Sequence, residues 1–306
     1  MKKSILFAAF AALTMVFTTS CENDDDFSCN GSNSSSYGKS AELSLNVDVD
    51  GYNATRAANI VTGWASLTNP AIGVSVYKGT AATSGLYANS RANTEYKYSG
   101  GLWNTTAAPS LYAASGYVTA YYPFVADADP TALDITVDNK TDVMYAPLGA
   151  SVVSVNEPQA QLTMRHALAR IGFTLSKSGY TGSGYVSYFT VESKGVAKQG
   201  TFNSVTGEWS ETSTNTLTDY YANRPIESPS RDDLFVIPAS SGTEQVKLSF
   251  VIDAATYSIT TTAKIEKGKV YVFPVTVTDK GLSVSNVSIT DWETATGTTG
   301  GTVQPE

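Results

Sequence analysis

Residues 41–50 alternate apolar and polar side chains without a break. The odd-numbered positions are apolar and the even-numbered positions are polar, which is the period of an extended strand. This segment therefore predicts a strand with one face in a hydrophobic core and the other in water. Its apolar positions after Ala41 are Leu43, Leu45, Val47 and Val49. We expect these four side chains to point into the core.

Short strand-like runs recur along the rest of the chain, and Gly, Pro and Asn separate them. The chain is also rich in Thr, Val and Tyr, residues that favour strands. Many short strands at close spacing predict an all-β chain with two β-sandwich domains. The clearest runs are 72–77, 117–122, 133–137, 152–155, 171–175, 185–191, 234–237, 246–252, 257–261, 270–278 and 282–289.

Turn and breaker residues refine this prediction. Thr206-Gly207 lies between Phe202 and Trp209 and predicts a hairpin, and Lys267-Gly268 predicts a turn before Val270. Pro274 lies inside a strand-like run, so we expect an edge strand or a bulge there. The only helix-like stretch is 162–170.

The domain boundary is expected near Glu157-Pro158, because a proline disfavours a continuous element at that point. The expected organisation has four parts. These are a signal peptide at 1–20, a tether at 21–40, an N-terminal sandwich at 41–158, and a C-terminal sandwich at 159–306 with a flexible tail from Thr294 to Glu306.

The first 21 residues predict export and lipidation. Lys2 and Lys3 precede an apolar run at 5–17, which is shorter than the roughly 20 residues that span a bilayer. Thr19-Ser20-Cys21 then provides the small residues and the cysteine of a lipoprotein cleavage box. We expect Cys21 to be the acylated first residue; the alternative is ordinary signal cleavage that leaves Cys21 free.

The segment after Cys21 is polar and acidic, so we expect a disordered tether. Loss of Lys2 and Lys3 with the signal peptide moves the formal charge from −8 to −10. An acidic chain argues against nucleic acid as a partner, because such affinity depends on basic contacts to phosphate. Cys29 is the one cysteine left unmodified, which excludes an internal disulfide framework.

Signatures of catalysis are weak. His166 is the single histidine, and its apolar neighbours favour a packed or capping imidazole over a catalytic one. Asn46, Asp48, Asp50 and Gly51 resemble the start of a calcium loop, but the twelfth position is Ala57 and not the required Glu. The chain has 28 Asp and Glu, and no spacing singles out a glycosidase pair. We therefore expect no enzyme, no metal and no cofactor.

Several segments, taken in order, resemble the fimbrillin family, the type V pilins and related surface lipoproteins of anaerobic Gram-negative bacteria. They are Thr55-Arg56-Ala57, Tyr121-Tyr122-Pro123-Phe124, Asp142-Val143-Met144-Tyr145-Ala146, the segment from His166 to Phe173, Phe235-Val236-Ile237-Pro238, the segment from Gly268 to Thr278, and Ile289-Thr290-Asp291-Trp292-Glu293.

This resemblance implies two transthyretin-like β-sandwich domains and a lipoprotein precursor. It implies cleavage by an Arg-specific protease after Arg56, which makes Ala57 the new first residue, and polymerisation with other fimbrial subunits by strand exchange. The acidic residues 22–26 resemble the signal that sends such lipoproteins to the outer face of the outer membrane. The alternative for Arg56 is a solvated loop charge.

The strand at 41–50 is expected to fill a groove that another subunit's strand later occupies. A possible donor strand is 282–289, in which Leu282 and Val284 share one face and Val287 and Ile289 share the next. The parity break at Ser285-Asn286 predicts two short strands or a bulge. The alternative is that this segment is the ordinary last strand of the second domain.

Three functions remain at this point. The first is a structural or adhesive subunit of fimbriae on the cell surface, with a host or bacterial ligand. The second is a non-polymerising surface lipoprotein that binds glycans, for which exposed Tyr and Trp would provide stacking platforms. The third is a surface hydrolase, which would depend on a carboxylate.

Overall fold

The computed structural model describes residues 39–50, 63–88, 90–138, 141–213, 215–227, 233–292 and 301–303. Two 3-10 helices are present, Trp64–Ser66 (η1) and Ala82–Ser84 (η2), and all other regular elements in these residues are β-strands. The prediction of an all-β chain is confirmed.

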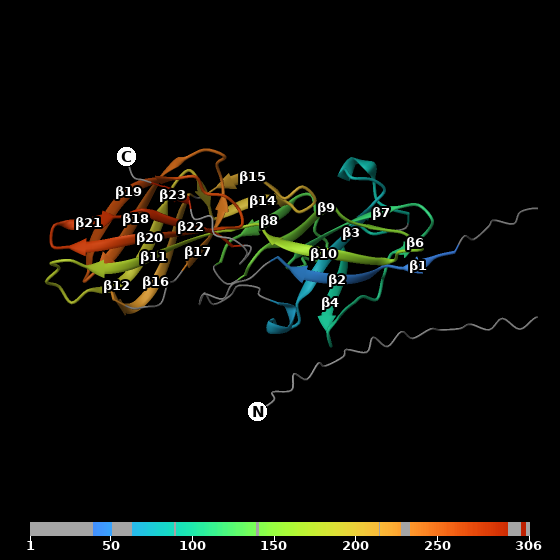
Figure 1. Cartoon of the computed structure of the whole chain (residues 1–306), viewed down its shortest axis with the longest axis horizontal. Helices are drawn as coiled ribbons and strands as arrows, with labels where there is room; N and C mark the ends of the chain where they lie inside the picture. The colour runs from blue at the N-terminus through green and yellow to red at the C-terminus, as the bar shows by residue number, and fades with distance from the viewer. Residues whose placement is uncertain are drawn as a thin grey trace, which may run out of the picture. The chain divides into compact units, whose positions relative to one another are not determined.

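The first lobe is built on a seven-stranded sheet (Figure 1). Its order is β2 (Ser44–Val49), β10 (Gln159–His166), β9 (Met144–Val153), β7 (Gly116–Tyr122), β3 (Ala71–Tyr77), β4 (Thr94–Ser99) and β5 (Leu102–Asn104). A small sheet of β1 (Ala41–Glu42) and β6 (Ser110–Leu111) adjoins it. The edge strands β2 and β5 contact each other, so the sheet curls around one hydrophobic core.

The second lobe is a sandwich of two sheets around a second hydrophobic core. One sheet has the order β13 (Val196–Ala197), β17 (Asp233–Pro238), β11 (Ala169–Lys177), β20 (Lys269–Thr278), β22 (Val287–Asp291) and β23 (Gly301–Val303), and β21 (Gly281–Val284) also pairs with β20. The other has the order β16 (Thr216–Pro225), β12 (Tyr185–Glu192), β18 (Glu244–Ile252) and β19 (Ala255–Ala263).

A third small sheet joins the two lobes. β8 (Leu133–Thr136) precedes the last strands of the first lobe, yet it pairs with β14 (Gln199–Asn203), which in turn pairs with β15 (Glu208–Ser213). A third hydrophobic cluster lies here and takes residues from both halves of the chain, including Tyr145, Phe202 and Trp292. The lobes are therefore connected by a shared sheet and by continuous apolar packing.

The hairpin expected at Thr206-Gly207 is confirmed. Phe202 of β14 pairs with Trp209 of β15, and Gly207 between them has a φ of 78°, a conformation that glycine adopts without steric cost. The Phe202 and Trp209 rings also pack against each other, with centroids 4.6 Å apart. Gly268, before β20, has a φ of 69°.

The helix-like interpretation of residues 162–170 is wrong. This stretch contains the end of β10 and the start of β11, and burial along β10 alternates residue by residue. Leu162, Met164 and His166 are all buried. Their spacing suits a strand, and the buried run from Ala167 to Ala169 made the pattern resemble a helix face. Pairing with β2, β9, β17 and β20 decides the conformation.

Pro274 also corrects the expectation of an edge strand or a bulge, since β20 is an interior strand and its register with β11 continues through Pro274 without a shift. Pro274 lies opposite Thr174 of β11. On the other side of β20, pairing with β22 stops at Val272 and pairing with β21 begins at Val275. The Pro274 carbonyl accepts a hydrogen bond from the Ser285 N–H in that gap. The missing N–H of proline therefore falls where the neighbouring strand is itself interrupted.

The break expected at Ser285-Asn286 is confirmed, because β21 and β22 are two short strands on either side of it. Glu157 and Pro158, where the domain boundary is expected, lie in a turn between β9 and β10. The Pro158 carbonyl accepts a hydrogen bond from Ser44, and β10, which follows it, pairs with β2. After β10, the chain passes through Ala167 and Leu168 into β11 of the second lobe.

Candidate functional site

The first strand lies at one edge of the first lobe. β2 runs parallel to β10, with Leu45 opposite Ala160, Val47 opposite Leu162 and Val49 opposite Met164 (Figure 1). At the start of this segment, β1 pairs with β6. The pairing is non-local, since more than 100 residues separate β2 from β10 along the chain.

One face of this strand lies in the core of the first lobe. Leu43, Leu45 and Val47 have exposed fractions of 3%, 8% and 5%. Val49 is only half-buried, at the rim of the same cluster. Burial of a Val or Leu side chain contributes about 1.5–3 kcal/mol, so the three buried side chains together contribute about 5–9 kcal/mol.

Side chains and a loop carbonyl contact the outer edge of the strand. The Leu43 N–H donates to the Pro109 carbonyl at 3.0 Å. The Leu43 carbonyl accepts a hydrogen bond from the Tyr96 hydroxyl at 3.1 Å, and the Val47 carbonyl accepts one from Trp64 Nε1 at 2.8 Å. The strand is thus held by a backbone ladder on one side and by separate contacts on the other.

Trp64 and Tyr96 are functional candidates that the sequence pattern did not single out. Trp64 packs edge-on against Trp103, with ring centroids 5.0 Å apart, and it also contacts Tyr122 at 5.5 Å. Burial raises the pKa of the Tyr96 hydroxyl, so this group remains a hydrogen-bond donor at neutral pH. No local spacing predicts either contact, because both depend on how distant strands are arranged.

Cys21, Arg56 and Ala57 lie outside the described residues, as do Cys29 and residues 294–300 and 304–306. Residues 51–62, which include Arg56, form the covalent connection between the first strand and Gly63. The structure therefore describes the first strand and its contacts, but not the predicted cleavage site at Arg56.

The possible donor residues lie in the second lobe. Leu282 and Val284 belong to β21, and Val287 and Ile289 belong to β22. Val287 is buried and the other three are partly buried against the core of the second lobe. Both strands pair with β20, so in this structure the segment forms the late strands of its own domain.

His166 is packed inside the protein. It is 2% exposed, its Nδ1 lies 2.8 Å from Oδ2 of buried Asp142, and its ring stacks on Trp292 with centroids 4.3 Å apart. The Arg170 guanidinium lies over the Trp292 ring, 5.2 Å from its centroid. The arrangement is that of a buried polar contact between the lobes, with the imidazole shielded from any substrate.

Within the described ranges, no group of three His, Cys, Asp or Glu side chains is arranged to hold a metal ion. The same part of the chain contains no helix of the length and apolar character needed to cross a membrane.

The chain is similar to known proteins in two respects: a family model matches its sequence, and solved structures share its fold. The family model described as fimbrillin-like matches residues 55–292. No curated protein sequence matches the chain.

Solved structures share the fold at low sequence identity. A Bacteroides uniformis protein with a proposed role in cell adhesion is 19% identical, with a TM-score of 0.60 over 82% of this chain and 99% of that one. A Bacteroides ovatus protein with the same proposed role is 17% identical, with a TM-score of 0.59 over 84% of this chain and 99% of that one. The C-terminally truncated tip fimbrial protein Mfa3 of Porphyromonas gingivalis is 8% identical, with a TM-score of 0.50 over 82% of this chain and 100% of that one.

Proposed function

This chain belongs to the fimbrillin-like family, and on that premise we propose that it is a structural or adhesive subunit of a cell-surface fimbrium, assembled by exchange of its first strand. The observation that carries the proposal is the way in which the structure holds that strand. Leu43, Leu45 and Val47 fill a core, yet only β10 pairs with β2 in the main sheet. A strand held in this way is one that another chain's strand can replace.

Loss of the strand would leave two complementary features. The edge of β10 from Gln159 to Met164 would lose its parallel partner, and the positions of Leu43, Leu45 and Val47 would become apolar hollows. An unpaired strand edge beside such hollows recruits an extended segment, since the backbone supplies hydrogen bonds and alternate side chains fill the hollows.

Cleavage after Arg56 would release the first strand from its covalent connection to Gly63. We propose that an Arg-specific protease performs this step and that the assembled chain begins at Ala57. The location supports it, because residue 56 falls in the connection between β2 and η1. Cleavage alone would leave the strand seated by its core contacts until a donor displaces it.

N-terminal sequencing of surface polymers tests the processing step. Polymers of the unaltered protein should begin at Ala57. Arg56→Lys keeps the charge but removes the arginine, so it should block cleavage by an Arg-specific protease. The protein should then remain uncleaved and should not assemble into polymers. Chains in assembled fibres that still begin at Cys21, or normal assembly by Arg56→Lys, would count against the proposal.

We also propose that Cys21 is acylated and anchors the protein to the outer membrane, with its lobes outside the cell. The partners are then the anchoring lipid, other fimbrial subunits and a ligand on a host or bacterial surface. Metabolic labelling with an alkyne palmitate analogue should mark the protein and spare Cys21→Ala. Protease added to intact cells should degrade it; full protection from the protease would contradict the location.

A further inference from the structure

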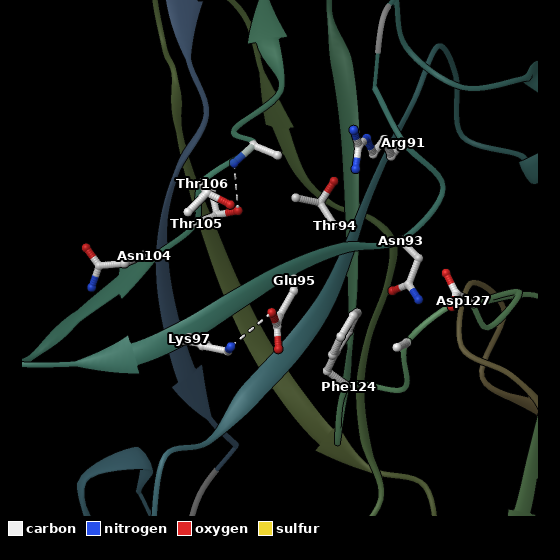
Figure 2. Close-up of a pocket in the computed structure, with 12 residues that line it drawn as sticks. Arg91, Asn93, Thr94, Glu95, Lys97, Asn104, Thr105, Thr106, Phe124 and Asp127 are labelled. Carbon is white, nitrogen blue, oxygen red and sulfur yellow. Dashed lines mark hydrogen bonds and ion pairs between the residues drawn. The ribbon is translucent and has the colours of Figure 1, made fainter.

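A polar pocket lies on the outer side of β4 in the first lobe. Along this strand, the side chains of Thr94 and Tyr96 are buried, whereas Glu95 and Lys97 face the opposite way. The pocket extends from Glu95 and Lys97 to the segment after β5 and to the loop after β7 (Figure 2). It has a volume of about 520 Å³.

The loop that carries the aromatic side of the pocket is held by specific contacts. The Asn93 Nδ2 donates to the Val125 carbonyl at 2.8 Å and to the Ala128 carbonyl at 3.3 Å. The Val125 N–H donates to the Tyr121 hydroxyl at 3.2 Å. These bonds fix the loop against the start of β4 and so place Phe124, which is half-buried, beside Glu95 (Figure 2). The ring is positioned before any ligand arrives, which reduces the entropy lost on binding.

The lining has the chemistry of a saccharide site. Arg91 and Lys97 supply donors, while Glu95 and Asp127 supply acceptors, so the four charges balance. Glu95 and Lys97 already form an ion pair at 3.2 Å. This balance disfavours a strongly anionic ligand and suits hydroxyl groups, which both donate and accept. The remaining lining residues are Asn104, Thr105, Thr106, Ala107, Phe124 and Ala126, together with Asn93 and Thr94.

We propose that this pocket binds a neutral saccharide, with Phe124 against the C–H face of a sugar ring and Glu95 and Lys97 bonded to its hydroxyls. The site does not depend on strand exchange, because it lies on the face of β4 opposite Tyr96, whose hydroxyl reaches the first strand. The subunit would therefore bind saccharide at this pocket whether or not it polymerises.

A second surface provides an internal control. Tyr185, Tyr188 and Tyr220 are exposed on the outer face of the β12–β16 pair, and the Tyr188 and Tyr220 rings lie 5.1 Å apart. Tyrosines on a sheet face could also stack on sugars. The pocket is favoured because it combines a hollow, donors and acceptors on several sides, and an aromatic ring that the loop holds in place.

The test is a binding screen of the purified full chain on an array of neutral and anionic oligosaccharides, followed by calorimetry with each neutral glycan bound. Phe124→Ala and Glu95→Gln should each weaken binding, and Tyr220→Ala should leave it unchanged. Each of these two losses is expected to be about 3–10-fold.

Thermal unfolding of each variant separates binding from folding. Glu95→Gln should change stability little, because the Glu95–Lys97 ion pair is solvent-exposed. The proposal is overturned if no neutral glycan binds, if only sulfated or sialylated glycans bind, or if binding follows Tyr220 instead of Phe124 and Glu95. These outcomes leave the assembly tests untouched, so the two proposals can fail separately.

Discussion

The indole Nε1 of Trp64 donates a 2.8 Å hydrogen bond to the backbone carbonyl of Val47. Val47 precedes residue 56 in the chain and Trp64 follows it, so this bond joins the two pieces that cleavage after Arg56 would create. Trp64 is 5% exposed and packs on Trp103. The tryptophan is therefore a natural reporter of whether the first strand is seated.

We expect removal of the first strand to shift Trp64 fluorescence to longer wavelength, because the indole loses its partner and gains water. The chain should be cleaved after Arg56 and separated from the released segment in mild denaturant before emission is recorded. The chain has 4 Trp, so Trp64→Phe serves as the control in which the shift should disappear. Emission that stays constant after the strand has left would contradict the role of this contact.

Leu45→Ala tests how firmly the strand's apolar face supports the first lobe. The side chain is 8% exposed within the core cluster, so its truncation should lower the free energy of unfolding by about 2–5 kcal/mol. Ser44→Ala, one residue away on the exposed face, should change it by no more than about 0.5 kcal/mol. Denaturant unfolding of the uncleaved chain measures both, and equal effects would show that the alternation does not define the buried face.

The local pattern of residues 41–50 was enough to predict the first strand, because its period of two is unbroken. The same kind of pattern misled at 162–170, where consecutive buried residues between two strands resembled a helix face. Pro274 misled for a related reason, since its place depends on an interruption in a neighbouring strand far along the chain. Local periodicity identifies strands but does not identify their neighbours.

The candidate sites divide in the same way. Leu43, Leu45 and Val47 could be predicted from alternation alone, and Val49 differs because the strand's end lies at the rim of the core. Trp64, Tyr96 and the pocket around Phe124 could not be predicted. Each is assembled from segments that meet only after the sheet forms, and the residues themselves carry no distinctive spacing.

The buried contact between His166 and Asp142 predicts a strong effect on stability. His166→Phe keeps a ring against Trp292 but leaves Asp142, which is 1% exposed, without its 2.8 Å partner. Loss of one member of a buried pair costs about 3–5 kcal/mol. Adding Asp142→Ala should recover part of that loss, because the unpaired carboxylate is gone. Unfolding by denaturant measures the cycle; a double variant no more stable than His166→Phe alone would contradict it.

Asp253 predicts a dependence of stability on acid pH. Its carboxylate accepts hydrogen bonds from the Tyr185 N–H at 2.9 Å and the Gly184 N–H at 2.7 Å, and these bonds lower its pKa below the ordinary value of 3.8. A carboxylate with a lowered folded-state pKa stabilises the protein above its unfolded pKa, and the contribution is lost as pH falls through the folded value.

Asp253→Asn is the suitable variant, because the residue has a φ of 48°, a conformation that Asn tolerates. The variant should be less stable than the unaltered protein at pH 7. The difference should stay constant down to about pH 4 and shrink below it, as the native carboxyl is protonated. Melting temperatures of both proteins from pH 7 to pH 2.5 measure this. A difference that grows as the pH falls would show that the hydrogen bonds do not favour the charged form.

The donor strand can be identified by crosslinking between subunits. Gln161 lies on β10 opposite Asn46, and both side chains are exposed; Ser283 is exposed on β21 between Leu282 and Val284. If 282–289 replaces the first strand of a neighbour, Gln161→Cys and Ser283→Cys would approach each other between chains, with Cys29→Ser removing the other thiol. Crosslinked ladders should appear only after cleavage at Arg56.

The matched control is Thr256→Cys in place of Ser283→Cys. Thr256 is exposed on β19, and this variant should give no ladders. Ladders without cleavage, equal ladders from the control, or crosslinks confined to single chains would each reject this segment as the donor, leaving it as the last strand of its own domain.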